Sequence, residues 1–500
     1  MSLLNVMLGE STVFLVVILA FFCIHFYIKS IWSSPKNFPR GPTPLPLIGN
    51  LHLLDLKRPQ NSLMKLAEKY GNIYTFHMGL QKLVVLAGYE MVKDALVNHA
   101  YEFGDRGHVP IFEETAQGNG LSFGRGESWK QMRRFTLTTL RDFGMGKKTI
   151  ADRIVEETTY LIEVLKSYKG LPFENTMIIN SAVSNIICSI VFGERFDYKD
   201  EKFIGILKVM NEFVKLSGSP MSQLFNCFPF LRFLPGDHKS SFQKRRALFD
   251  YLNKAYLDFK SKLNPNDLRS YIEAFIVKQE EEVNKMENVY FHEKNFLVST
   301  SNLFSAGTET TSTSLRWGFL LLMKYPEVQR KVHEEIDHVI GSERNPTIED
   351  RKNMPYTNAV LHEILRFGNV IPLNLQHETA MDTHFRGYFL PKGTQVIPLL
   401  TSVLFDKSQW ETPNEFNPSH FIGADGKFVK RDAFLPFSAG RRVCLGETLA
   451  KMELFLFFTV LLQRFTLLPP PGITEKDLDL EPITGGTCAP KPYEMCAISR

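Results

Sequence analysis

The sequence predicts a mainly α-helical protein with small β-sheets, an α+β fold, preceded by one N-terminal transmembrane helix. Three observations support this prediction. The apolar residues between positions 111 and 370 recur mainly at helical spacing. Short strand-like segments lie on either side of that region, near residues 73–86 and 384–398. An apolar run at residues 13–28 opens the chain and approaches the roughly 20 residues that a bilayer-spanning helix needs.

The N-terminal run is predicted to be an uncleaved signal anchor over residues 1–32. A cleaved signal peptide is the alternative, but only Glu10 precedes the run as a charged residue, and no small-residue cleavage site follows it. The basic residues Lys29, Lys36 and Arg40 come after the run. Its C-terminal side is therefore expected to stay in the cytosol.

A Pro-rich segment over residues 33–50 follows the anchor, with prolines at positions 39, 42, 44 and 46. Prolines at this spacing favour an extended, stiff backbone, so we expect a hinge that fixes the body at the membrane surface. A flexible linker or an SH3-type ligand would have the same composition. The remaining residues, 51–500, are expected to form the catalytic domain.

Within the body, the expected elements follow from periodicity and from Gly and Pro breaks. They are a helix at 63–70, strands at 73–76 and 82–86, helices with breaks near 170, 218, 235 and 265, strands at 384–389 and 395–398, an irregular stretch up to Cys444, and a buried helix at 449–462. The body has no G-x-G-x-x-G after a strand and no Walker loop, so no nucleotide site is indicated.

Composition excludes several classes of protein. With 44% hydrophobic and 22% charged residues, the chain is globular rather than disordered, and its net charge of +4 is too small to indicate nucleic-acid binding. The 41 phenylalanines suit a large apolar interior that could hold a flat cofactor. The six cysteines include no C-x-x-C pair, which argues against a disulfide framework or a zinc site and fits a reducing compartment.

One cysteine lies in an unusual setting, the F-x-x-G-x-R-x-C-x-G pattern of residues 437–446. Gly440 and Gly446 permit a tight loop that brings Cys444 to the start of a buried helix. The helix N-terminus and the neighbouring Arg441 and Arg442 are expected to favour the thiolate. A single thiolate suits one axial bond to a metal, whereas an inert buried cysteine is the alternative.

A second segment, residues 306–311, places a glycine and several threonines inside a long helical stretch at 295–324. These residues are poor helix formers, and a threonine hydroxyl can bond back to the carbonyl four residues earlier. A carboxylate beside a hydroxyl, here Glu309 and Thr310, can relay protons to an oxygen-binding metal. A simple helix kink is the alternative.

Two further pairs have helical spacing. Glu363 and Arg366 are an i, i+3 acid–base pair, and a solvated salt bridge is the common explanation of such a pair. Trp129 and Arg133 project from one face and suit a carboxylate at the edge of a ring. Core packing for the tryptophan and a surface ion pair for the arginine are the alternatives.

In this order, the motifs resemble those of the cytochrome P450 family of haem-thiolate monooxygenases over about residues 33–500, and most resemble animal microsomal members of family 2. The resemblance implies the cytochrome P450 fold and a haem b cofactor (iron protoporphyrin IX). It implies that Cys444 is the axial ligand of the haem iron, and that Thr310 and Glu309 are the distal acid–alcohol pair of catalysis.

The resemblance also implies roles for three sets of residues. The residues that would bind the haem propionates are Arg442, Trp129, Arg133, His377 and Arg106. The residues that would hold the proximal side of the pocket structurally are Glu363, Arg366 and His420, the last standing in an F-x-P-x-x-F segment where many members have arginine. The residues that would line the substrate pocket are Phe304, Ala306, Val370, Ile371, Leu373, Gly486 and Thr487.

The expected function is a membrane-bound monooxygenase that inserts one oxygen atom from O₂ into lipophilic substrates such as fatty acids, xenobiotics or steroids. Its partners would be an NADPH-dependent flavoprotein reductase and, in addition, cytochrome b5. The chain would be anchored once in the endoplasmic reticulum membrane with its catalytic domain in the cytosol, and no nucleic acid is expected. A haem-thiolate peroxide isomerase or dehydratase and a non-enzymatic, membrane-anchored haem sensor are the alternatives. The basic residues that could attract an acidic reductase are Arg125, Lys130, Arg134, Lys147, Lys148, Lys430, Arg431 and Arg441.

Overall fold

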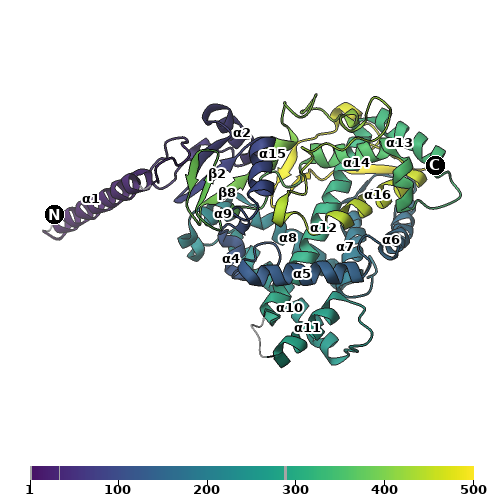
Figure 1. The fold of residues 1–500 in the computed structure, drawn as a ribbon, viewed down its shortest axis with the longest axis horizontal. Coiled ribbons are helices and arrows are strands. Elements are labelled where there is room, and N and C mark those ends of the chain that lie inside the picture. The colour runs from purple at the N-terminus through teal and green to yellow at the C-terminus, as the bar shows by residue number, and fades with distance from the viewer. Residues whose placement is uncertain (1–2, 33, 286–289) are drawn as a thin grey trace.

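The computed structural model describes residues 3–32, 34–285 and 290–500 (Figure 1). Helices make up most of this part of the chain. They are α1 (Leu3–Trp32), α2 (Pro59–Tyr70), α3 (Tyr89–Lys93), α4 (Pro110–Ala116), α5 (Gly126–Asp142), α6 (Lys148–Ser167), α7 (Thr176–Val191), α8 (Glu201–Ser217), α9 (Pro220–Cys227), α10 (Asp237–Ser261), α11 (Tyr271–Lys285), α12 (Glu293–Lys324), α13 (Pro326–Val339), α14 (Pro355–Gly368), α15 (Leu400–Leu404) and α16 (Glu447–Arg464).

In the described part of the chain, the strands are short and form four small sheets. They are β1 (Ile73–Met78), β2 (Gln81–Leu86), β3 (Asp105–Arg106), β4 (Phe173–Glu174), β5 (His377–Glu378), β6 (Thr383–Phe385), β7 (Tyr388–Leu390), β8 (Gln395–Pro398), β9 (Phe465–Leu468), β10 (Pro482–Thr484), β11 (Cys488–Pro490) and β12 (Glu494–Ser499). The largest sheet has the order β1-β2-β8-β5-β3, in which only β2 and β8 are parallel. The others are β4-β12-β9, β10-β11 and β6-β7.

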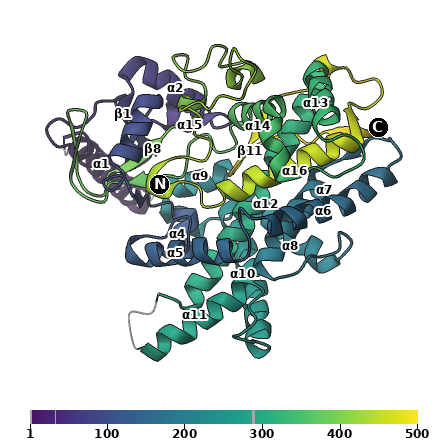
Figure 2. The same cartoon turned by 45° about the vertical axis from the view of Figure 1, so that its right-hand side comes forward.

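The sheet with β1, β2 and β8 lies on the side of the body from which α1 projects, and the helical layers lie on the other side (Figures 1 and 2). Helix α12 runs through the helical part and packs against α7, α10, α14 and α16. The side chains of α16 are buried along nearly all of its length from Leu449 to Gln463, because apolar residues occupy every face of this helix. The main apolar core therefore surrounds α12 and α16. Helix α12 carries Glu309 and Thr310, and α16 directly follows the loop of Cys444.

The predicted α+β class is confirmed, and most elements lie where periodicity placed them. The helix expected at 63–70 is α2, the strands at 73–76 and 82–86 are β1 and β2, and the strand at 395–398 is β8. The single strand expected at 384–389 is wrong, because the chain reverses there. Arg386 and Gly387 both have positive φ, and they form the turn of the β6–β7 hairpin.

The segment predicted as a stiff, extended hinge is bound to the body over its described part, 34–50, whereas residue 33 lies outside the described residues. Thr75 Oγ1 donates a 2.5 Å hydrogen bond to the carbonyl of Pro39, and Asn50 Nδ2 donates to the carbonyl of Thr43 at 3.1 Å. Leu45 and Gly49 exchange both of their backbone hydrogen bonds. The segment thus lies along β1 and then turns back on itself.

Helix α1 extends away from the body on the left of Figure 1. Within the described residues, no helix is both long enough and apolar enough to cross a membrane. The transmembrane anchor stays a prediction, and residues 1 and 2 of it lie outside the described part.

Candidate active site

At one position, the backbone of the cysteine loop adopts a conformation that only glycine permits. The loop contains a single 3₁₀ turn, η6 (Gly440–Arg442). Gly440 has a φ of +71°, and a Cβ there would lie 1.7 Å from the carbonyl oxygen of Leu96. The Cys444 N–H donates to the carbonyl of Phe437 at 3.0 Å, which closes the loop directly before α16. As predicted, the sulfur therefore lies at the N-terminal end of a buried helix.

The Cys444 side chain is exposed, yet burial raises the pKa of its thiol. Both observations hold if the sulfur borders an internal space rather than bulk solvent. The backbone N–H groups of Gly446 and Glu447 at the start of α16, and the Arg133 cation, lower this pKa, as expected for a helix N-terminus, whereas the expected effect of Arg441 and Arg442 stays a prediction. A metal cation bound to the sulfur would supply the positive charge that the free thiol lacks.

Polar groups without partners gather beside this loop. Buried nitrogens with no hydrogen-bond partner among the described residues are Trp129 Nε1, His377 Nε2, and both Nη atoms of Arg442. The Arg442 guanidinium lies 3.4 Å from the centre of the Trp129 ring, and its Nε donates to the carbonyl of Gly104 at 2.8 Å. Such orphaned donors are costly unless a further group accepts from them.

The same cluster carries an excess of positive charge. Burial and the neighbouring Arg106 lower the pKa of Arg442 to about 8, while burial and Arg133 lower the pKa of Arg106 to about 9. In the described part of the chain, the only carboxylate paired with them is Asp105, 3.8 Å from Arg442. The cluster thus lacks anions, and the two propionates of a haem beside Cys444 fit this deficit.

His377 has a fixed tautomer in this cluster. Its Nδ1 lies 2.7 Å from the carbonyl of Phe103 and must donate to it. Burial, Arg106 and Arg442 together hold the pKa of His377 well below its usual range. A carboxylate at Nε2 would reverse this effect, because the ring would then be protonated and donate at both nitrogens.

The predicted relay residues lie in the middle of α12. Thr310 Oγ1 donates to the carbonyl of Ala306 at 2.8 Å, the i−4 bond that the sequence predicts. Glu309 Oε1 accepts from Thr487 Oγ1 at 3.1 Å and from Thr313 Oγ1 at 3.4 Å. Burial raises the pKa of Glu309. Glu309 and Thr310 share no direct hydrogen bond among the described contacts, so a proton passing between them needs a water or a side-chain rotation.

The residues expected to line the substrate pocket are only partly brought together. Ala306 is exposed in the middle of a long packed helix, which places it on the same kind of internal space as Cys444. A Cβ on Gly486 would lie 3.0 Å from Val214 of α8, so the β10–β11 turn closes against that helix. Phe304 is buried in the helical core, edge to face with Phe192.

Three other pocket candidates lie in the segment between α14 and β5. Val370 and Ile371 are half-buried, and the carbonyl of Val370 accepts from the Cys488 N–H of β11 at 2.9 Å. Leu373 packs against the apolar cluster that covers β1 and β2. Through these contacts the segment connects β11 to the sheet that contains β1 and β2. The three residues therefore do not form one wall of a pocket.

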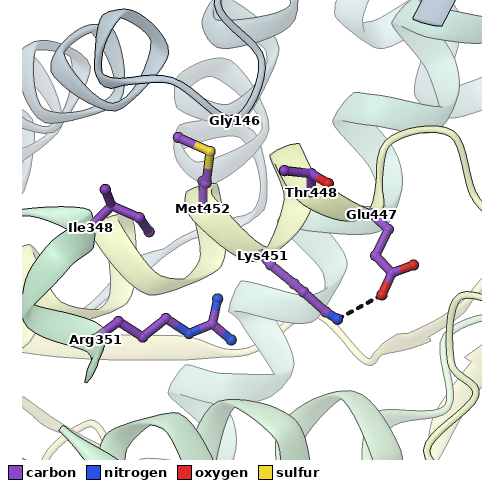
Figure 3. Close-up of a pocket in the computed structure, with 7 residues that line it drawn as sticks. All are labelled: Gly146, Ile348, Arg351, Glu447, Thr448, Lys451 and Met452. Carbon is purple, nitrogen blue, oxygen red and sulfur yellow. Dashed lines mark hydrogen bonds and ion pairs between the residues drawn. The ribbon is translucent and has the colours of Figure 1, made fainter. Parts of the chain in front are cut away.

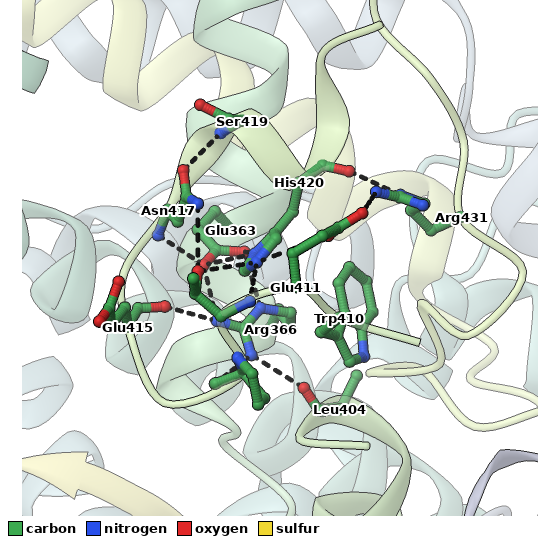
Figure 4. Close-up of polar contacts among 12 residues, drawn as sticks. Glu363, Arg366, Leu404, Trp410, Glu411, Glu415, Asn417, Ser419, His420 and Arg431 are labelled. Atoms are coloured by element: carbon green, nitrogen blue, oxygen red, sulfur yellow. Dashed lines mark hydrogen bonds and ion pairs between the residues drawn. The ribbon is translucent and has the colours of Figure 1, made fainter. Parts of the chain in front are cut away.

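The pair Glu363 and Arg366 is not a solvated salt bridge. Both side chains are fully buried, and Arg366 donates to Glu363 through Nε and Nη2 at 2.7 Å each (Figure 4). The remaining Arg366 donors reach the carbonyls of Leu404, Pro413 and Glu415. This network joins α14 to the irregular stretch that leads to Cys444.

His420 completes the network. Its Nε2 accepts from the Thr412 N–H at 3.2 Å, so the proton lies on Nδ1, which is 3.3 Å from Glu363. The Asn417 N–H also donates to Glu363, at 2.8 Å. The contacts agree with the structural role expected for these three residues.

A surface pocket of about 300 Å³ lies on the outer side of α16, one turn after the cysteine loop (Figure 3). Arg351 comes from the 3₁₀ helix η4 (Ile348–Asn353), and Lys451 forms a 2.6 Å ion pair with Glu447. The lining residues are Gly146, Ile348, Arg351, Glu447, Thr448, Lys451 and Met452. Sequence reasoning did not find this pocket, because its walls are distant in sequence.

Known proteins resemble the chain over nearly its full length. A family model described as Cytochrome P450 matches residues 39–497. Cytochrome P450 2K1 of Oncorhynchus mykiss is 50% identical and covers 100% of both chains. Cytochrome P450 2F2 of Mus musculus is 46% identical over 92% of this chain and 94% of its own. Cytochrome P450 2C23 of Rattus norvegicus is 46% identical over 99% and 100%.

Proposed function

The chain belongs to the cytochrome P450 family and is a haem-thiolate monooxygenase related to family 2 members, and from this premise we propose which of its residues bind the haem and which supply protons. Cys444 is the axial ligand of haem b, and Trp129, Arg133, Arg442, His377 and Arg106 hold its propionates. The observation that carries this proposal is the set of buried, unpartnered donors beside the cysteine loop, which needs anions that the described part of the chain does not supply.

When bound, haem supplies the iron at which O₂ is activated. The chain supplies the protons. The Thr310 hydrogen is donated to the carbonyl of Ala306, so the lone pairs of the hydroxyl are free to hold a water. The raised pKa of Glu309 lets this carboxyl take up and release protons closer to neutral pH than an exposed glutamate does. Together they deliver protons to the distal side.

A reconstituted reaction tests the activity. The full chain, a purified flavoprotein reductase, NADPH and isotopically labelled O₂ are combined with a panel of lipophilic compounds. We expect one labelled oxygen atom in each product and no product without NADPH. Product formed without NADPH, or carrying oxygen only from water, would contradict the assignment.

We propose that the reductase docks on the outer side of α16, around the pocket of Figure 3. Two of the expected basic residues are unsuited to docking, because Arg125 donates to the carbonyl of Arg106 and Arg431 to the carbonyl of His420. Lys130 pairs with Glu127, and Arg441 lies over the Tyr101 ring. The remaining four expected cations are all exposed: Arg134, Lys147, Lys148 and Lys430. Lys147 directly follows Gly146, which lines the pocket.

Charge reversal tests this docking surface. Lys147→Glu with Lys148→Glu should slow reductase-driven turnover, more so at low salt, and should spare turnover driven by peroxide. Lys65→Glu, an exposed change on α2, is the control. Equal losses of reductase-driven and peroxide-driven turnover would show that the variants damage the enzyme itself.

We also propose that the chain lies on the endoplasmic reticulum membrane with its body in the cytosol. The apolar side chains of α1 are exposed; Phe14 and Phe21, for example, are 65% and 66% exposed. A second exposed apolar set lies on the body, with members Leu45, Leu47, Ile48, Leu80, Phe230, Phe233 and Leu234. Its segments touch, since Gln81 donates to the carbonyl of Asn226. So much exposed apolar surface favours burial in lipid.

Truncation separates the two apolar sets. Deleting residues 1–32 should give a more soluble body that still takes up haem and still binds lipid vesicles weakly. Adding Phe230→Ser and Phe233→Ser should remove the remaining vesicle binding. A truncated chain that expresses well but cannot take up haem would show that the boundary is wrong.

A further inference from the structure

Arg316 of α12 is a buried cation that forms no ion pair with an acidic residue in the described part of the chain. Its side chain is 6% exposed. Its Nη2 donates to the carbonyl of Pro490 at 3.3 Å, whereas its buried Nε has no hydrogen-bond partner among the described residues. Burying a guanidinium in this state is costly, so the position of the nearest acidic group matters.

Glu309 lies on the same face of α12 as Arg316. Seven residues make almost two full helical turns, so the two side chains leave the helix in nearly the same direction, about 10 Å apart along its axis. Between them, Thr313 Oγ1 donates to Glu309 Oε1 at 3.4 Å.

This face of α12 packs against strand β11. The Thr487 hydroxyl, directly before the strand, donates to Glu309 at 3.1 Å. Arg316 donates to the carbonyl of Pro490, at the other end of the strand. Thr487 and Thr313 are both buried. One strip between α12 and β11 therefore has the acid at one end and the cation at the other.

The elements packed against α12 bring no other uncompensated charge to Glu309. Helix α7 and strand β11 contain no charged residue, and every charged residue of α8 is exposed. Helix α16 brings Glu453, whose pKa burial raises to about 8, so its carboxyl is mostly neutral at pH 7. In α14, Glu363 and Arg366 pair with each other. Arg245 of α10 acts on the first turn of α12, more than four turns before Glu309.

The effects on Glu309 have different physical origins. Burial raises the pKa of its carboxyl, while the hydrogen bond from Thr487, the charge of Arg316 and the hydrogen bond from Thr313 lower it. Of the three effects that favour the carboxylate, only that of Arg316 acts through charge. A charge acts across a buried strip without direct contact, because the low dielectric constant of the interior screens it weakly.

We propose that Arg316 is a positioning residue that sets the charge state of Glu309, and with it the pH range in which the chain delivers protons to the distal side. This inference rests on the proton role proposed for Glu309 and adds the residue that controls it. Arg316 acts through Glu309 alone. By favouring the carboxylate, its charge lets Glu309 release a proton near neutral pH and take one up again, as a relay requires.

Infrared spectroscopy of the haem-loaded full chain measures the titration of Glu309 without turnover. The carbonyl band of a protonated acid that is missing in Glu309→Gln belongs to Glu309. Arg316→Gln keeps a donor for the Pro490 carbonyl but removes the charge, so this titration should move to higher pH. Arg316→Lys keeps the charge and should restore most of the original titration.

Lys324→Gln is the matched control. Lys324 is a cation of the same helix that also donates to a backbone carbonyl, that of Leu478 at 2.9 Å. It lies 15 residues after Glu309, which is about 22 Å along the helix. Its removal should therefore leave the Glu309 titration in place.

The reconstituted reaction gives the second readout. In Arg316→Gln, the step in the pH profile of product formation should move to higher pH together with the infrared titration. Product formation at neutral pH should fall about two- to tenfold, the range for removing one charge about 10 Å away from a titrating group. Arg316→Lys and Lys324→Gln should keep the profile of the unmodified chain.

Two results would overturn the inference. One is a Glu309 titration that stays in place in Arg316→Gln. The other is an equal displacement in Arg316→Gln and Arg316→Lys, since Arg316 would then matter for packing rather than for charge. Arg316→Met, a second neutral variant, decides the question in the same way if the glutamine variant does not hold haem. An infrared titration that moves while the pH profile of product formation stays in place would contradict the proton role proposed for Glu309 and leave the electrostatic role of Arg316 standing.

Discussion

The Thr487 hydroxyl donates a 3.1 Å hydrogen bond to Glu309 Oε1, across 178 positions of sequence. The contact ties the β10–β11 turn to the middle of α12. It also lowers the pKa of Glu309, against the larger effect of burial. Thr487 thus orients the carboxyl that is proposed to handle protons, rather than serving only as pocket lining.

Thr487→Val keeps the shape of the side chain and removes its donor. Without that hydrogen bond the pKa of Glu309 should rise further, so the step in the pH profile of product formation that belongs to Glu309 should move to higher pH. Product formation at neutral pH should fall about two- to tenfold. Thr487→Ser, which keeps the hydroxyl, should preserve both. A pH profile that does not move in the valine variant would exclude this role.

Thr310→Ala should uncouple the reaction. Without the hydroxyl and its water, protons reach the distal side less readily, so product should fall about ten- to a hundredfold. NADPH consumption should fall much less, with hydrogen peroxide accounting for the difference. Product, peroxide and NADPH are counted in one reconstituted reaction. Product and NADPH use that stay matched would mean that Thr310 is only a helix residue.

Glu363→Gln should destabilise the fold. The change removes the carboxylate from a fully buried, bidentate pair and leaves the Arg366 charge uncompensated, which costs about 3–5 kcal/mol. Glu349 and Lys352 are a pair with the same i, i+3 spacing on the surface, so Glu349→Gln should cost less than about 1 kcal/mol. Unfolding temperature and haem retention are the measurements. Similar losses in the two variants would contradict the structural role of the buried pair.

Glu453, inside α16, should make stability depend on pH. Burial raises its pKa to about 8 from an ordinary value of 4.5, and Oε1 has no hydrogen-bond partner among the described residues. Between these two values the folded chain holds a proton that the unfolded chain releases, so stability falls as pH rises, by about 1.4 kcal/mol per unit. Below pH 4.5 this contribution is fully present, and above pH 8 it is lost.

Glu453→Gln removes this titration. As pH rises from 5 to 8, the stability of the variant should therefore increase relative to that of the unmodified chain. Unfolding temperatures at several pH values measure the difference, and Glu447→Gln, on the same helix but paired with Lys451, is the control. Parallel curves for the unmodified chain and Glu453→Gln would show that Glu453 does not hold a proton in the folded state.

Local patterns in the sequence were enough to place the cysteine loop, the Thr310 bond to Ala306 and the long helices, because each depends on residues a few positions apart. The hairpin at β6–β7 was missed because its turn, Arg386 and Gly387, lies inside a segment that reads as one strand. The strands β9 to β12 were also not predicted. They are short, and β12 is defined by pairing with β4 and β9, from distant parts of the chain.

Electrostatics was the part that sequence reasoning handled least well. Arg441 and Arg442 are neighbours of Cys444 in sequence, but Arg442 stacks on Trp129 and Arg441 lies 4.4 Å from the Tyr101 ring. Which cation faces the thiol is a property of packing. Arg316 and Glu453 were missed for the same reason: a single charge in a helix is usually solvated, and only the packed structure shows that these two are buried.

The central claim is that Cys444 binds the haem iron as a thiolate. The measurement that tests it most directly is the absorption spectrum of the reduced, carbon-monoxide-bound full chain, compared with Cys444→Ser and with Cys188→Ser, a buried cysteine outside the loop. The account predicts the long-wavelength Soret band that only thiolate ligation produces in the unmodified chain and in Cys188→Ser, and its loss in Cys444→Ser. An unchanged band in Cys444→Ser would contradict the account.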